Sequence, residues 1–118
     1  MIKSYRDLNI YQDSYNLAIR VYKSTHVIPE REQYDIGSQL RRAATSIPMN
    51  IAEGYGKKES EAEFKRFLRM AAGSVNEVEV LLDMIKDLGY MDINDHQELR
   101  GCYEIVGKQI HTLIRKWK

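Results

Sequence analysis

Apolar residues recur every three or four positions along most of the chain, which is the period of an amphipathic helix. The clearest run, between residues 60 and 88, consists of Phe64, Leu68, Ala71, Val75, Val78, Leu82 and Ile85. A similar run near the C-terminus consists of Leu99, Cys102, Val106, Ile110, Leu113 and Trp117. No useful length of sequence alternates with period two, so the pattern predicts no strands.

The breaks between these runs predict four helices, near residues 7–28, 31–54, 60–88 and 95–117. Residues that typically end or cap helices lie at the breaks: Ile28-Pro29, Gly54-Tyr55-Gly56, a Ser60 and Glu63 capping box, Gly89, and Asn94 or Asp95. Short connections between long helices favour antiparallel neighbours. The prediction is therefore an all-α, up-down-up-down four-helix bundle, with residues 1–118 forming one domain. Pro48 lies inside the second helix and is expected to kink it, because proline lacks the backbone donor.

The first and third predicted helices carry more apolar surface than a lone bundle needs. The first helix has two apolar stripes about 120° apart at roughly 100° per residue, and the third has apolar residues beside its main run. A wide core face would explain this surplus, but soluble monomers rarely expose so much apolar area, which favours burial against other subunits. The candidate oligomer-interface residues are Ile10, Leu17, Val21, Phe67 and Leu81.

The composition is that of a soluble globular protein, with 43% hydrophobic and 30% charged residues and a net charge of +1. The single cysteine, Cys102, cannot form an internal disulfide, and no apolar run approaches the length of a membrane span. The sequence also lacks the apolar core of a secretion signal at its N-terminus. We therefore expect a cytoplasmic protein that does not associate with membranes.

Bundle topology would sort the charges to opposite ends. Residues 1–13, 54–69 and 105–118 together carry +6, whereas residues 26–35 and 77–104 carry −8. A basic end is a plausible site for a phosphate backbone, although charged helix ends are often merely solvated. The candidate nucleic-acid contacts are Lys57, Lys58, Lys65, Arg66, Arg69, Lys108, Arg115 and Lys116, with Lys118 beside them.

The residues indicate no catalytic, metal or cofactor site. Di-iron bundles use Glu-x-x-His pairs, but the residues three positions before His26, His96 and His111 are Lys23, Ile93 and Lys108. The segment from Gly54 to Lys58 lacks the spacing of a phosphate-binding loop and follows a helix rather than a strand. The three histidines are expected to lie in turns or on the surface. We therefore predict that the protein is not an enzyme.

Two groups of polar residues in the second helix are interpreted structurally. Arg41 and Arg42 fall outside the apolar face and could pair with Glu77 and Glu79 of the third helix, with carboxylates of a neighbouring subunit, or with phosphate; the structural pairing is favoured. Asn50 and Glu53 lie near Pro48 and are expected to form a polar network around backbone groups freed by the proline.

The block RRAA…SI..NIAEG followed by S..EF..FL resembles the four-helix bundle proteins encoded in intervening sequences of bacterial 23S ribosomal RNA genes. The resemblance covers nearly the whole chain, and its signature residues are Arg41, Arg42, Asn50, Glu53, Gly54, Glu63 and Glu77. It implies a homo-oligomer, expected to be a pentameric ring, with no catalytic residues. A related branch, the accessory variability proteins of diversity-generating retroelements, binds nucleic acid and engages a reverse transcriptase.

Two functional hypotheses follow. The first is a non-enzymatic homopentamer that contacts RNA, DNA or a nucleoprotein, with a nucleic-acid enzyme such as a reverse transcriptase as a candidate partner. The second is a protein–protein adaptor or assembly scaffold with no role in nucleic-acid binding.

Overall fold

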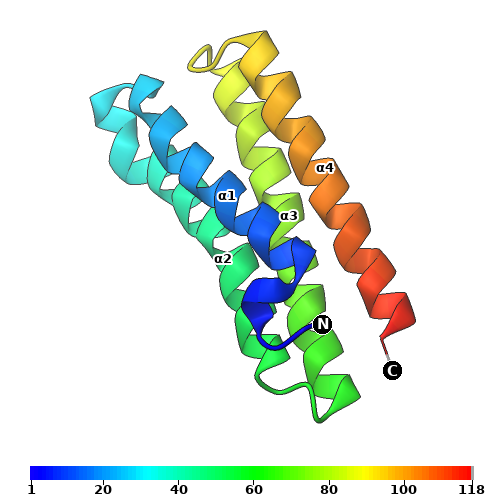
Figure 1. The fold of residues 1–118 in the computed structure, drawn as a ribbon. Helices are drawn as coiled ribbons and strands as arrows, with labels where there is room; N and C mark the ends of the chain where they lie inside the picture. The colour runs from blue at the N-terminus through cyan, green and yellow to red at the C-terminus, as the bar shows by residue number, and fades with distance from the viewer. Residues whose placement is uncertain (118) are drawn as a thin grey trace.

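The computed structural model describes residues 1–117 and contains four long helices, which form an antiparallel bundle (Figure 1). They are α1 (Asn9–Ser24), α2 (Ser38–Tyr55), α3 (Glu61–Asp87) and α4 (Ile93–Lys116). Short helical turns precede α1 at Tyr5–Asp7 and link α1 to α2 at Thr25–Val27, Glu30–Glu32 and Gln33–Gly37, the last being π-helical. Within residues 1–117 there is no strand. The predicted all-α, four-helix architecture is confirmed.

The core is built from the predicted helical seams. All seven apolar residues of the main run on α3 are buried, with at most 2% of their surface exposed. The largest enclosed side chains, Tyr103, Phe64, Leu40, Ile47 and Ile51, come from α2, α3 and α4. The predicted run on α3 is therefore confirmed as core. On α4 only Leu99, Val106 and Ile110 of the predicted run are buried, whereas Tyr103 lies outside that run and is fully buried.

The helix ends differ from the prediction at several points. α1 stops at Ser24 and α2 begins only at Ser38, because the intervening chain forms short turns instead of extending either helix. The N-cap of α4 is Asp92, whose side chain accepts a hydrogen bond from the Asn94 backbone N–H at 2.6 Å, rather than Asn94 or Asp95. Ser60 caps α3 through the Glu63 N–H, but the Glu63 side chain turns to Arg66 and completes no capping box with Ser60.

The two helix-ending glycine segments use different backbone geometry. Gly89 has a φ of 81°, and the following N–H of Tyr90 returns to the Ile85 carbonyl at 3.0 Å, which is the Schellman arrangement that favours glycine. Gly56 has a φ of −63° and needs no such freedom.

Gly54 allows α2 and α3 to approach closely. A Cβ added at this position would lie 2.7 Å from Cβ of Phe67 and 3.1 Å from Cδ1 of Phe64. The glycine of the NIAEG block is thus explained by packing between two helices rather than by a turn. α2 continues without interruption through Pro48, and the kink stays a prediction.

The five candidate interface residues are buried inside a single chain, so that prediction is wrong. Their exposed fractions do not exceed 9% for Ile10, Leu17, Val21, Phe67 and Leu81. The reason is that α1 packs against both α2 and α4, which buries the stripe that holds Ile10, Leu17 and Val21, and that α3 packs against the same two helices, which buries Phe67 and Leu81. Exposed apolar side chains lie elsewhere: Tyr15, Ile19, Tyr22 and Met49 on the α1/α2 face, and Met70, Val80 and Met84 along α3.

None of the helices formed by residues 1–117 has the length and apolarity that a bilayer crossing requires.

Candidate nucleic-acid interface

The N-terminus, the turn between α2 and α3, and the end of α4 all lie at one end of the bundle (Figure 1). Aromatic contacts hold this end together: the Phe64 ring lies 4.6 Å from the Trp117 ring and 6.2 Å from the Tyr55 ring, in both cases edge to face. The structure thus brings the turn and the last part of α4 together, as the bundle topology predicts. We call this end the basic pole and define it by the eight candidate cations Lys57, Lys58, Lys65, Arg66, Arg69, Lys108, Arg115 and Lys116. Lys118 lies outside the described residues.

Two of the eight cations are paired with carboxylates. The Arg66 guanidinium donates to both carboxylate oxygens of Glu63, at 3.0 and 3.2 Å, and Lys65 Nζ lies 3.2 Å from Glu61. The Arg66 hydrogen bond lowers the pKa of the Glu63 carboxyl. Glu63 therefore stays ionised at neutral pH, and its charge largely cancels that of Arg66.

The other six cations form no ion pair within residues 1–117, and all of them are exposed: Lys57, Lys58, Arg69, Lys108, Arg115 and Lys116. Two of these cations rest on aromatic rings. Lys58 Nζ lies 4.8 Å from the Tyr55 ring centre, and Lys57 Nζ lies 5.8 Å from that of Phe67. Such contacts attract the ammonium groups to the turn while leaving their outer side in water. The turn therefore presents two positioned positive charges to solvent.

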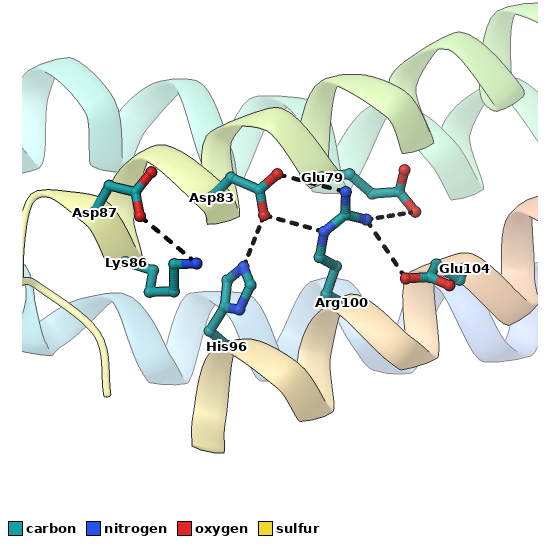
Figure 2. Close-up of polar contacts among 7 residues, drawn as sticks. All are labelled: Glu79, Asp83, Lys86, Asp87, His96, Arg100 and Glu104. Carbon is teal, nitrogen blue, oxygen red and sulfur yellow. Dashed lines mark hydrogen bonds and ion pairs between the residues drawn. The ribbon is translucent and has the colours of Figure 1, made fainter. Parts of the chain in front are cut away.

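A polar cluster joins α3 to α4 in the half of the bundle away from the basic pole (Figure 2). Asp83 is its centre: His96 Nε2 lies 2.7 Å from one carboxylate oxygen, and Arg100 Nε donates to the same oxygen at 3.0 Å. Arg100 also reaches Glu79 at 3.4 Å and Glu104 at 3.6 Å. The His96 hydrogen bond and the positive charge of Arg100 lower the pKa of Asp83.

His96 is 6% exposed, so the prediction of a turn or surface role for this histidine is wrong. One ring nitrogen contacts Asp83 and the other is buried without a hydrogen-bond partner in the described chain. The cluster therefore connects α3 to α4 through a histidine that is almost fully enclosed.

The sequence contains a signal for this cluster in the spacing of its charged residues rather than in the period of its apolar ones. Glu79 and Asp83 are four residues apart on α3, and His96, Arg100 and Glu104 follow at the same spacing on α4. The two sets are nearly equidistant from the turn at residues 88–92. In an antiparallel pair, residues equidistant from the turn lie opposite each other, which brings the opposite charges together.

Arg41 makes contacts within the chain, but with the turns that follow α1 and not with the candidate partners Glu77 and Glu79 of α3. Its guanidinium donates to the Gln33 side-chain oxygen at 3.0 Å, to the Gln33 carbonyl at 2.8 Å and to Thr25 Oγ1 at 3.2 Å. Glu79, the proposed partner, is bound by Arg100 instead. Arg41 thus ties α2 to the turns that follow α1, and it is directed away from Glu79 because those turns fold back over the start of α2.

Arg42 and Glu77 are exposed, and no ion pair joins them in the described chain. Asn50 does form a polar network, in which its amide donates to the Ser46 carbonyl and hydroxyl, both at 2.9 Å. The Ser46 hydroxyl lies 2.8 Å from that of Ser74 on α3. Glu53, the other predicted member, is exposed and takes no part in these hydrogen bonds.

Within residues 1–117, no group of three or more His, Cys, Asp or Glu side chains lies close enough to hold a metal ion.

Comparisons with known proteins agree with this architecture. One similar structure is a crystal structure, at 1.70 Å resolution, of a protein of unknown function from the S23 ribosomal protein family of Bacteroides thetaiotaomicron VPI-5482. It aligns with a TM-score of 0.82 over 91% of this chain and 99% of that one, at 22% sequence identity, which shows a shared fold. No curated protein matches the sequence significantly. The family model of the 23S rRNA-intervening sequence proteins matches residues 6–112, and the chain therefore belongs to this family.

Proposed function

We propose that this protein is a non-enzymatic, homo-oligomeric bundle that binds RNA or DNA through the basic pole. The observation that carries the proposal is the gathering of six exposed, unpaired cations at one end of a chain whose net charge is only +1. A phosphate backbone is the polyanion that such a cluster fits best, because each cation that meets a phosphate releases condensed counterions. In this proposal no residue of the chain has a catalytic role.

Electrostatics gives the proposal a quantitative form. If all six unpaired cations of one chain met phosphates, the logarithm of the binding constant would fall with that of salt concentration with a slope of about −4 to −5. A contact made only by the two lysines of the turn would give a slope of about −2. The opposite, acidic half of the bundle would repel the nucleic acid and so orient it toward the basic pole.

Self-assembly is the second part of the proposal. Apolar side chains are exposed on two different surfaces, the α1/α2 face around Tyr22 and Met49 and the outer stripe of α3 around Val80 and Met84. A contact between two different surfaces of the same chain is heterologous, and repeating it generates a ring when the rotation closes. We expect a pentameric ring in which the basic poles lie on one face. Light scattering at micromolar concentration tests this, and a stable monomer would contradict it.

Mobility-shift titration at several salt concentrations tests the nucleic-acid part. The variant K57E/K58E reverses the two cations of the turn, and K23E/R42E is its matched control, since Lys23 and Arg42 are exposed and lie away from the pole. Both variants change the net charge equally, so a general electrostatic effect would weaken both. The proposal expects the pole variant to bind at least tenfold more weakly than the control at low salt. Equal losses, or no binding by the parent protein, would overturn it.

A protein–protein adaptor is the second candidate, and the groove between α1 and α2 supports it. This groove, of about 410 Å³, is lined by Tyr11, Tyr15, Tyr22, Pro48 and Met49, and two of its tyrosines are about half exposed. Aromatic and methionine side chains are enriched at protein interfaces. A protein partner that is retained after nuclease treatment and lost in a Y15S/Y22S variant would favour this candidate; loss of the partner on nuclease treatment would count against it.

A further inference from the structure

A second groove, between the start of α1 and the end of α4, has the composition of a ligand site. Its volume is about 630 Å³, which is within the range of small-molecule pockets. α1 packs less extensively against α4 than against α2, so the two helices leave this space between them. Leu8 and Ile10 of the buried core lie on one side of it, and Ile105 and Leu113 of α4 lie on the other.

The lining is aliphatic and basic. No aromatic side chain lines the groove, so a nucleobase would find no ring on which to stack. Ile105 is 58% exposed, which leaves apolar surface in water that a ligand could cover. Lys108, Thr112 and Lys116 follow one another at four-residue spacing along α4 and place two ammonium groups and a hydroxyl along one edge.

The only carboxylate in the lining, Asp7, is already engaged. One of its oxygens accepts the backbone N–H groups of Lys3 at 2.7 Å and Ser4 at 3.1 Å, and these bonds lower the pKa of Asp7. Neither Lys108 nor Lys116 pairs with it or with any other acid in residues 1–117. The two ammonium groups are therefore available to an anion that enters the groove.

We propose that this groove binds a single-chain amphipathic carboxylate, of the fatty-acid type. The alkyl chain lies against Leu8, Ile10, Ile105 and Leu113, and the carboxylate lies between Lys108 and Lys116. The aliphatic lining selects an alkyl chain, and the two unpaired lysines select a negative head group. Lys108 and Lys116 also belong to the basic pole. The inference nevertheless does not depend on nucleic-acid binding, because its test uses an amphiphile and no nucleic acid.

Isothermal titration with dodecanoate, at concentrations below its micelle formation, tests the proposal. Dodecyltrimethylammonium has the same chain length and the opposite charge and serves as the matched ligand. We expect one dodecanoate per chain and binding of the ammonium compound at least tenfold weaker. The double variant K108E/K116E should weaken dodecanoate binding at least tenfold and strengthen binding of the ammonium compound. Such a reversal would not follow from unfolding, and circular dichroism verifies that the variant is helical.

A second pair of variants tests the apolar part of the site. Ile105 and Ile93 both lie on α4 and are both 58% exposed, but only Ile105 lines the groove. I105N should weaken dodecanoate binding by about three- to tenfold, whereas I93N should leave it unchanged. Equal effects of the two substitutions, or equal multi-site binding of both amphiphiles, would overturn the proposal. Binding to anionic vesicles without binding of monomeric dodecanoate would assign the groove to a membrane surface and likewise overturn it. A second copy of the chain in the groove would also overturn the proposal; in that case light scattering would show that I105N, but not I93N, lowers the mass of the oligomer.

Discussion

Replacing Gly54 with alanine tests the close approach of α2 to α3. The new Cβ would lie 2.7 Å from Cβ of Phe67, a distance at which the two atoms overlap. The Phe67 Cβ is attached directly to the backbone of α3, so it cannot rotate away as the end of a flexible side chain could. The helices must move apart locally, and overpacking of this kind costs about 1–3 kcal/mol.

The helix propensity of alanine opposes this cost. Alanine is favoured over glycine by up to about 1 kcal/mol in a helix interior. Since Gly54 is next to the last residue of α2, the full gain is not expected. We therefore expect G54A to lower the free energy of unfolding by about 1–2 kcal/mol.

Gly73 provides a matched control. It lies within α3 with its Cβ position open, since no atom would come within 4 Å of an added Cβ. G73A should gain the propensity without the clash and raise the free energy of unfolding by about 1 kcal/mol. The same chemical change should thus have opposite signs at two positions.

Urea unfolding followed by far-UV circular dichroism measures both effects, at one fixed protein concentration because self-association would shift the midpoint. A domain of this size should show a change in melting temperature of roughly 4 °C for each kcal/mol. If G54A is as stable as the parent, or if both variants change stability in the same direction, the packing argument is refuted.

Three further predictions concern polar side chains that lie between elements of the bundle. Because the folded-state pKa of Asp83 is lowered, the stability it contributes is complete above its unfolded-state pKa of about 3.9 and is lost as the pH falls through the lower folded-state value. D83N should therefore lower the free energy of unfolding by at most about 1 kcal/mol at neutral pH, since the carboxylate is 41% exposed. In urea titrations below about pH 4, the difference in free energy of unfolding between D83N and the parent should disappear. A difference that stays constant with pH would contradict this. Tyr103 is fully buried, and its hydroxyl has no hydrogen-bond partner in residues 1–117. Y103F should therefore be neutral or stabilising by about 1 kcal/mol in thermal melts. A clear loss of stability would show that the hydroxyl has a partner. R41K should lose about 1–2 kcal/mol in urea unfolding, because an ammonium group cannot reproduce the planar fork that binds Gln33 and Thr25; full stability in the lysine variant would make those bonds dispensable.

Features that depend on helical period were predictable from the sequence. The seam of α3 from Phe64 to Ile85 requires only the three- and four-residue spacing, and a side chain on that seam faces the core in any bundle. The position of the basic pole followed from the order of the helices, because a short turn returns the chain to the same end.

Features that depend on which helix lies next to which were not predictable in the same way. Val21 and Phe67 lie outside the main seams, and a sequence pattern cannot distinguish a second core face from an oligomer surface. Arg41 illustrates a similar limit, since its partners belong to turns whose path no period describes. Gly54 was interpreted as a helix end because the spacing gave no sign of how closely α3 approaches.

The space between α1 and α4 also has a consequence for the order of folding. The other neighbouring pairs, α1 with α2, α2 with α3 and α3 with α4, are consecutive in the chain and are joined by short connections, so they form at a small loss of loop entropy. Only the contact between α1 and α4 joins the two ends of the chain, and it is the less extensive of the two contacts that α1 makes with other long helices. We therefore expect the contact between α1 and α4 to form last during folding. The first residues of α1 and the last turns of α4 should accordingly exchange their amide hydrogens through local openings that leave the α2–α3 hairpin intact.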